Sequence, residues 1–291
     1  MAASHSLEAE LSYAALDSNV NYRVVGDGIE YNTGRFETHR VNIRNGRLED
    51  LSFSLDVHGF ALVHRPSGVR DFFDKFQISE LYPIDAAATF LNCTGATRIA
   101  PLGIVRRSSD NQPGFDPRAP IRPDFLWGQP PVCEVHVDFT PDYLESLARS
   151  TYSRVFPGAP GFTRYLVCSL WRVFSPPPHE FPLAVCDAGS VGSDEGVPNV
   201  FVNNMTELQK VAGDVRCGIC VPAATIFHYN RNHRWWYFPE MTRDEVLIVK
   251  IGDSDATKAQ RAPHTAFRDP CSRHANSRES IEFRAVAYFE E

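Results

Sequence analysis

The stretch RESIEFRAVAYF, residues 278–289, alternates polar and apolar side chains, most clearly between Ser280 and Ala285. Alternation with a period of two predicts a β-strand that turns one face toward a core. It also places Arg278 and Ser280 on one face of that strand, together with Glu282 and Arg284. Further strand-like runs precede this stretch at residues 164–172, 183–187, 224–229, 235–238 and 246–251.

The connections between these short runs are rich in proline and glycine. Many short strands with such connections favour a mainly β protein with flanking helices, built as a double-sheet jelly roll or barrel. No internal repeat or composition change divides the chain, so we expect one domain over residues 1–291. Within it, residues 1–50 are polar and uneven, with short strand-like runs such as Thr38–Ile43 between turn signals, and we expect an irregular segment packed on the domain.

The first half of the chain carries weaker signals than the second. In order, we expect an edge strand at 51–55, a buried strand at 58–64, a helix that begins at 67–74, a helix at 82–91, an edge strand at 98–107, a loop at 108–131 and a helix at 142–155. The loop at 108–131 contains six prolines. A long proline-rich loop in a compact domain is often functional, for example as a lid over a pocket.

Composition excludes several classes of protein. The 291 residues carry a formal charge of −7, which argues against a nucleic-acid partner. No apolar run approaches the ~20 residues of a membrane helix, and the first residues lack the basic and apolar regions of a secretory signal. The seven cysteines are an odd number scattered along the chain, which is typical of reduced thiols. These features predict a cytoplasmic protein.

A short motif, HVD at residues 136–138, offers two metal ligands. In a strand, His136 and Asp138 project from the same face and present an imidazole beside a carboxylate. So short a motif also recurs by chance, and the alternative is a surface strand with a solvated aspartate. His264, at the start of a later apolar run, supplies a third ligand if the fold brings it close. Two histidines and one carboxylate form the facial triad of non-haem Fe(II) oxygenases.

The alternating strand supplies a candidate anion site. Arg278 offers a planar fork of donors that suits a carboxylate, and the hydroxyl of Ser280 adds one more hydrogen bond. A metal triad beside such a site is what an iron enzyme that uses 2-oxoglutarate requires. Arg172 is a second candidate for the carboxylate, with substrate binding or an internal ion pair, for instance to Asp187, as alternatives. For Arg284 a structural salt bridge is the favoured role.

A polar break precedes the aromatic cluster at residues 235–237. His228, Asn230 and His233 stand in this break, so that they either line a substrate pocket with Trp235 or form the edge of a packed core. Phe139, directly after the HVD motif, is a further candidate for the substrate pocket. The core edge is the favoured interpretation for the polar break.

An ordered series of motifs resembles a known family. The series comprises LDVHGFALV (55–63), VRDF (69–72), HVD (136–138), SLWR (169–172), PLAVCDA (182–188), HYN (228–230), HRWWY (233–237), DEVL (244–247), PHTAF (263–267) and RESIEFRA (278–285). In this order, over about residues 50–290, the chain is similar to the fungal AsaB and gibberellin-desaturase-like hydroxylase/desaturase family, related to CmcJ.

The resemblance implies a cupin-like double-stranded β-helix and an oxygenase that uses Fe(II), O₂ and 2-oxoglutarate. It also implies a small secondary metabolite as substrate and His136, Asp138 and His264 as the metal ligands. Phe139 and Trp236 depart from the more polar residue and the tyrosine expected at their positions, which suggests a more apolar pocket.

The predicted function is therefore hydroxylation, desaturation or cyclisation of a small molecule, with the choice among these outcomes left open. Neither nucleic acid nor membrane is an expected partner, and the oligomeric state stays open. Two other classes remain: a metal-dependent isomerase or lyase on the same barrel, and a non-catalytic partner subunit of a biosynthetic pathway. Release of succinate separates the oxygenase from the isomerase, and stoichiometric iron separates it from the partner subunit.

Overall fold

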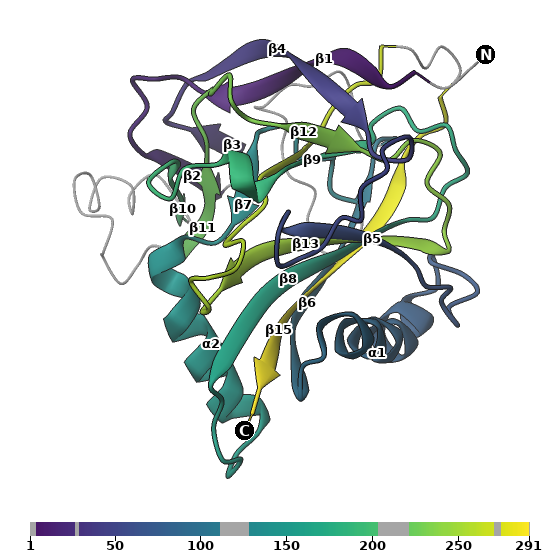
Figure 1. Cartoon of the computed structure of the whole chain (residues 1–291), viewed down its shortest axis with the longest axis vertical. Helices are drawn as coiled ribbons and strands as arrows, with labels where there is room; N and C mark the ends of the chain where they lie inside the picture. Colours follow the sequence, from purple (N-terminus) through teal and green to yellow (C-terminus); the bar gives the residue numbers. More distant parts are fainter. Residues whose placement is uncertain (1–3, 27–28, 111–127, 203–220, 271–274, 291) are drawn as a thin grey trace.

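Two β-sheets face each other in the computed structural model of the protein, which describes residues 4–26, 29–110, 128–202, 221–270 and 275–290 (Figure 1). Fifteen strands make up the two sheets in this part of the chain, and two α-helices flank them. This is the double-stranded β-helix that the sequence predicts.

The larger sheet has ten strands in the order β1-β4-β12-β9-β14-β7-β11-β10-β2-β3. Its strands are β1 (Ser6–Ala14), β2 (Asn21–Gly26), β3 (Ile29–Asn32), β4 (Phe36–Asn45), β7 (His136–Asp138), β9 (Leu183–Cys186), β10 (Val197–Val202), β11 (Val221–Ile226), β12 (Trp235–Tyr237) and β14 (His264–Ala266). The pairs β4–β12 and β2–β10 are parallel, and the other neighbours are antiparallel. The short central strands β7 and β14 therefore come from segments far apart in the sequence.

The smaller sheet has five strands in the order β5-β13-β8-β15-β6. These are β5 (Phe60–His64), β6 (Arg98–Ser108), β8 (Arg164–Val173), β13 (Glu245–Asp253) and β15 (Glu279–Phe289). All neighbours are antiparallel, and the predicted edge strand is indeed at the edge, as β6. Pro101 lies beside a register shift in β6, where a missing backbone N–H is tolerated.

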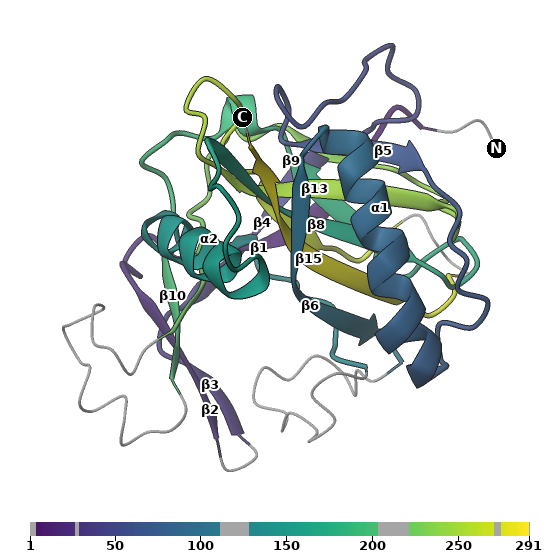
Figure 2. The same ribbon diagram turned by 90° about the horizontal axis from the view of Figure 1, so that it is seen from below.

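The helices cover different parts of the smaller sheet. A π-helical turn (η1, Gln77–Leu81) leads into α1 (Tyr82–Thr94), which packs its buried residues Tyr82 and Phe90 against Phe283 on the outer face of the sheet (Figure 2). The other helix, α2 (Pro141–Val155), packs at one end of the sandwich, where Tyr288 donates a hydrogen bond to the Ala148 carbonyl at 2.7 Å. A 3₁₀ turn (η2, Ala188–Ser190) follows β9.

Three expectations about the first half of the chain were wrong. Residues 1–50 are not irregular, because strands β1–β4 lie in them and pair within the larger sheet. Residues 51–55 form no strand, and residues 67–74 form no helix. The side chain of Asp85 explains the error at residues 67–74, since it accepts hydrogen bonds from the Ser67 hydroxyl and the Gly68 amide and holds this segment as a loop.

The other predicted strands and helices in the described residues are confirmed, within a few residues at their ends. The lid expected in the 108–131 loop concerns residues 111–127, which lie outside the described residues. No helix in the described ranges has the length and hydropathy needed to cross a membrane. The assignment of the whole chain to one domain stays a prediction.

Candidate functional site

The two predicted histidine ligands meet at the centre of the larger sheet. Strand β14 pairs with β7 so that His264 lies directly opposite His136, and the centroids of their rings are 4.5 Å apart. Paired residues on adjacent strands project to the same face, and Asp138, two residues after His136, shares that face. All three side chains are buried.

Each histidine is held in the tautomer that a metal needs. His136 Nδ1 lies 2.8 Å from the Glu134 carbonyl and His264 Nδ1 lies 3.1 Å from the Ala262 carbonyl. A carbonyl oxygen can only accept, so both Nδ1 atoms donate and both Nε2 atoms keep a free lone pair. Metal-bound histidines commonly donate their second N–H to a backbone carbonyl in this way. The donor set fits Fe(II).

Asp138 is engaged by an arginine of the opposite sheet. Its Oδ2 lies 3.1 Å from Arg284 Nε, without hydrogen-bond geometry, and the same guanidinium donates to both oxygens of Glu282 at 2.9 and 3.1 Å. In this conformation no three His, Cys, Asp or Glu side chains of the described residues form a group that could hold a metal ion. In this structure Arg284 is thus the charged partner of the Asp138 carboxylate.

The electrostatics of the site follow from burial and from these ion pairs. Burial, with a smaller effect of His264, holds the pKa of His136 well below its usual value, so the ring stays neutral and competent to bind a metal. Burial also raises the pKa of Asp138 despite the nearby Arg284. For Glu282, burial is outweighed by Arg284, which lowers the pKa of that carboxyl strongly.

Arg278, directly before β15, and Ser280, within it, lie on the same side as Glu282 and Arg284, and both are buried. Arg278 donates one hydrogen bond, from Nη1 to the Phe181 carbonyl at 2.9 Å, and its guanidinium lies 5.6 Å from the ring centroid of Trp171. Arg278 Nε and Ser280 Oγ have no hydrogen-bond partner in the described part of the chain. Burial and the charge of Arg107 lower the pKa of Arg278 to about 9. An anion beside the Arg278 guanidinium would raise this pKa again.

Arg172 lies on the other face of the same sheet. It pairs with Ile281, whose side chain alternates with those of Ser280 and Glu282, so it points toward α1 and away from the metal ligands. Its Nη2 donates to the Arg65 carbonyl at 2.8 Å, and its Nη1 donates to the Arg243 carbonyl. Asp187, the partner suggested by sequence, pairs with Arg234 instead. The structure does not bring Arg172 to the site.

Phe139 ends strand β7 in an unusual conformation. Its φ of 63° lies in the left-handed region, which non-glycine residues rarely adopt, and its carbonyl accepts a hydrogen bond from Thr225 Oγ1 at 3.0 Å. The ring contacts Tyr143 in the first turn of α2, with centroids 5.9 Å apart. The backbone thus turns at Phe139, directly after Asp138, and continues into α2.

The remaining candidates lie away from the metal ligands. Trp236 shares the face of His264, through the pairs Trp236–Val185 and Val185–His264, so its neighbour Trp235 projects from the opposite face. There Trp235 Nε1 donates to the Tyr13 hydroxyl at 2.9 Å.

Two polar candidates hold loops in place on that opposite side. His228 Nδ1 lies 3.1 Å from the Ala14 carbonyl, and Asn230 donates to Glu195 Oε1 at 2.9 Å. Asn230 and Trp235 also line a surface pocket of about 270 Å³, which includes none of the predicted metal ligands. The structure therefore separates these residues from His136, Asp138 and His264.

The sequence did not single out Arg107, nor the contact between Arg284 and Asp138. Arg107 pairs with Ser280 across β6 and β15, so it shares the face of Arg278 and Arg284. Its strand, with Pro101 and two consecutive arginines, shows no clear alternation that would assign a face. Only the pairing with β15 reveals its position.

Comparison with known proteins identifies the family of the chain. A family model described as "Oxidoreductase/YMDC permease-like domain" matches residues 11–288. The hydroxylase/desaturase CTB9 of Cercospora beticola is 31% identical to the chain, over 88% of the chain and 78% of the relative. The hydroxylase/desaturase efuI of Hormonema carpetanum is 29% identical, over 98% of the chain and 99% of the relative.

A solved structure supports the fold. It is described as the iron and alpha-ketoglutarate-dependent endoperoxidase NvfI, and it superposes with a TM-score of 0.79 at 22% identity over the full length of both chains. At this identity the likeness concerns the fold. A relative of the same name, an Fe(II)/2-oxoglutarate-dependent dioxygenase of Aspergillus novofumigatus, is 24% identical over 86% of the chain and 83% of its own length.

Proposed function

The chain belongs to the fungal hydroxylase/desaturase family of Fe(II)/2-oxoglutarate-dependent dioxygenases, and we propose that His136, Asp138 and His264 hold its iron. The observation that carries this assignment is the pair of histidines on facing positions of β7 and β14. Each donates its Nδ1 proton to a backbone carbonyl and keeps Nε2 free. A carboxylate on the same face completes the donor set.

The cosubstrate site that the geometry supports best is Arg278 with Ser280. The far carboxylate of 2-oxoglutarate would accept hydrogen bonds from Arg278 Nε and Ser280 Oγ, which are buried without a partner in the described residues. A buried cation with an unused donor is stabilised by an anion, and 2-oxoglutarate carries a second carboxylate at the end that does not bind the metal. Arg172 has no part in this site.

When bound, iron with 2-oxoglutarate and O₂ supplies the oxidation of a substrate C–H bond, coupled to conversion of 2-oxoglutarate to succinate and CO₂. The chain supplies orientation. The carbonyls of Glu134 and Ala262 hold the imidazoles, and Arg284, held by Glu282, supports the Asp138 carboxylate. The buried inner faces of the two sheets exclude water around these groups.

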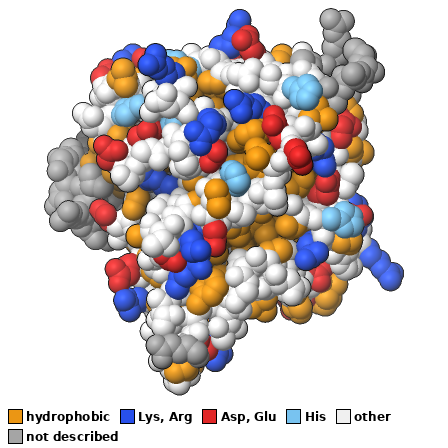
Figure 3. Space-filling view, in the orientation of Figure 1, with side chains coloured by type: hydrophobic (Ala, Val, Ile, Leu, Met, Phe, Trp, Pro, Cys, Tyr) orange, Lys and Arg blue, Asp and Glu red, His pale blue; other side chains and the backbone are white. Residues whose placement is uncertain are grey.

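The substrate is a small metabolite, in keeping with the family. We propose that nucleic acid is not a partner, because the chain is acidic and the face in Figure 3 shows acidic and basic side chains interspersed, without a continuous basic area. The reduced, unpaired state of Cys93, Cys133, Cys168 and Cys186 supports a reducing compartment such as the cytoplasm.

Metal content and cosubstrate binding test this function. The purified protein, loaded with Fe(II) without oxygen, should bind one iron and show the visible charge-transfer absorption of an Fe(II)–2-oxoacid chelate when 2-oxoglutarate is added. Both signals should be lost in His136→Ala and in His264→Ala, and both should persist in His64→Ala, which removes an exposed histidine of β5.

Two results would contradict the assignment: unchanged iron content in both ligand variants, or no response to 2-oxoglutarate in the wild-type protein. Iron binding without succinate formation from 2-oxoglutarate, with any candidate metabolite, would favour an isomerase or lyase.

A further inference from the structure

Arg107 is a third arginine on the inner face of the smaller sheet, and the functions above do not use it. It lies directly opposite Ser280 in the β6–β15 pair. Its charge acts on the pKa values of His136, Asp138 and Glu282, so the guanidinium lies within electrostatic reach of the metal ligands. It therefore belongs to the same site as Arg278.

The contacts of Arg107 leave most of its donors unused. Only Nη1 donates, to Gln129 Oε1 at 3.2 Å and to the Pro130 carbonyl at 3.0 Å, and both acceptors are uncharged. Nε and Nη2 form no hydrogen bond with another described residue. Arg107 keeps part of its surface accessible, in contrast to Arg278, which is 1% exposed.

The acidic side chains nearby are already engaged. Asp138 and Glu282 are the carboxylates whose charges favour the cationic form of Arg107, and both contact Arg284. The basic groups that act on Arg107 include Arg284, Arg23 and Arg278, so they add to the positive charge. Within the described residues, Arg107 therefore has no carboxylate of its own.

Loading the site with its expected ligands does not change this imbalance. A divalent metal would be balanced by Asp138 and by the metal-binding carboxylate of 2-oxoglutarate. The far carboxylate would balance Arg278, and Glu282 would balance Arg284. Among the described residues and these ligands, one positive charge, that of Arg107, is left without a counter-charge, and a partly buried charge is stabilised by a partner of opposite sign.

We propose that Arg107 binds a carboxylate of the organic substrate, so that the enzyme acts on small organic acids. The accessible position suits a ligand that arrives from outside, whereas the buried Arg278 suits the cosubstrate. The planar guanidinium, anchored at Nη1 by Gln129 and Pro130, presents Nε and Nη2 as one edge for a bidentate contact with a carboxylate. This inference rests on the proposed function, because the charge balance includes the metal and 2-oxoglutarate.

A matched pair of probes tests the proposal without knowledge of the natural substrate. Binding of 4-phenylbutyrate and of 4-phenylbutanamide is measured by calorimetry on the full chain loaded with Ni(II) and 2-oxoglutarate, a complex that does not turn over. The acid should bind about tenfold more tightly than the amide, as a charge-assisted pair predicts. Arg107→Gln should remove this preference and leave the affinity for 2-oxoglutarate within about threefold, while Arg107→Lys should retain part of the preference.

Arg106 provides the control, because it is the next residue in β6 and points to the other face. It pairs with Glu279 at 3.0 Å and lies over the ring of Phe73. Arg106→Gln should leave the preference for the acid intact.

Three results would overturn the proposal. The first is that the wild-type protein binds 4-phenylbutyrate no more tightly than 4-phenylbutanamide, or binds neither. Another is loss of the preference in Arg106→Gln. The third is a loss of 2-oxoglutarate affinity in Arg107→Gln as large as in Arg278→Gln, which would assign Arg107 to the cosubstrate. Wild-type protein that fails to bind Ni(II) and 2-oxoglutarate contradicts the proposed function itself, so the two failures are distinguishable.

Discussion

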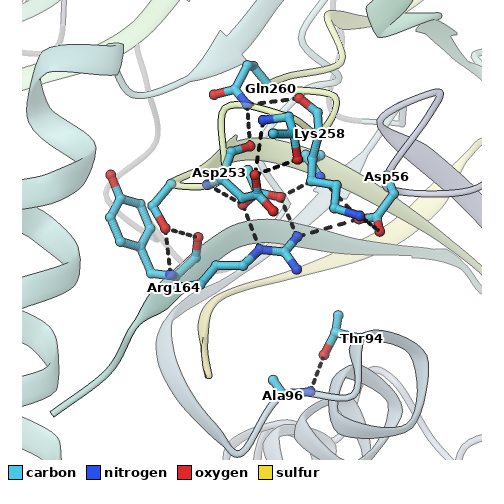
Figure 4. A network of polar contacts seen from close by, with 12 residues as sticks. Asp56, Thr94, Ala96, Arg164, Asp253, Lys258 and Gln260 are labelled. Atoms are coloured by element: carbon cyan, nitrogen blue, oxygen red, sulfur yellow. Dashed lines mark hydrogen bonds and ion pairs between the residues drawn. The ribbon is translucent and has the colours of Figure 1, made fainter. Parts of the chain in front are cut away.

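Two charged clusters on the smaller sheet differ in how completely their members are paired. The closed network (Figure 4) joins Lys250, Asp253, Arg164, Asp56 and Lys258. In it, Lys250 and Arg164 lie 2.7 and 2.6 Å from Asp253 Oδ2, and Lys258 lies 3.0 Å from Asp56. Every charge of the closed network has a partner of opposite sign.

The open cluster consists of Arg107, Arg278 and Ser280 on the inner face of the sheet. Its two arginines contact no carboxylate in the described residues, and two of its buried polar atoms have no partner there. Arg172 is also buried and its Nε has no hydrogen-bond partner in the described residues. Its two Nη atoms, however, donate hydrogen bonds to backbone carbonyls, and it lies beneath α1. Burial alone therefore does not distinguish Arg278 from Arg172. The difference is that the unpaired charge of the open cluster faces the proposed metal ligands.

The largest effect is expected in the closed network. Asp253→Ala would leave the fully buried ammonium of Lys250 with only the more distant Asp56, at 3.8 Å, and breaking a buried ion pair costs about 3–5 kcal/mol of unfolding free energy. Urea denaturation measures this loss, while the folded variant should bind 2-oxoglutarate as the wild-type protein does. Asp17→Ala, which removes an exposed pair with Arg35, should cost less than about 1 kcal/mol. Equal losses in the two variants would refute the distinction.

The next effect is expected in the open cluster. Arg278→Gln should weaken 2-oxoglutarate binding about 100-fold, the equivalent of one lost charge-assisted carboxylate contact. Unfolding free energy should fall little, because the variant also removes an unpaired buried charge. Calorimetric titration with 2-oxoglutarate and a urea curve separate the two quantities. A variant that binds the cosubstrate normally but unfolds readily would make Arg278 a structural residue like Arg172.

The smallest effect is expected at Arg284, which belongs to neither cluster and joins the metal ligand to Glu282. Arg284→Gln should lower metal affinity about tenfold, since partners that orient a ligand are usually worth 10- to 100-fold. A titration with Mn(II) measures this change. The matched variant Arg40→Gln alters an arginine of β4 on the surface and should leave metal affinity unchanged. Tighter binding of Mn(II) by Arg284→Gln would show that Arg284 competes with the metal for Asp138.

Local patterns in the sequence were sufficient for much of the fold. Strand-like runs identified β8 and β13, alternation identified β15, helical spacing identified α2, and Pro83 marked the first turn of α1. These signals arise within a few residues of one another, so no knowledge of the partner strand is required. In residues 1–50 they identified only the run at Thr38–Ile43, which lies in β4, and missed β1, β2 and β3. Strands β2 and β4 also pair there with distant segments, β10 and β12.

The same division applies to the candidate site. The sequence by itself determined the ligand types, the shared face of His136 and Asp138, and the shared face of Arg278 and Ser280, because a strand repeats every two residues. Only the tertiary structure decided that His264 lies opposite His136, that Arg172 points away while Arg107 points inward, and that Trp235 is remote from the metal ligands. The physical reason is that strand periodicity relates only the side chains within one strand. Which residues of different strands meet depends on the register between strands, and which face of a sheet encloses the site depends on whether a helix or the other sheet packs against it.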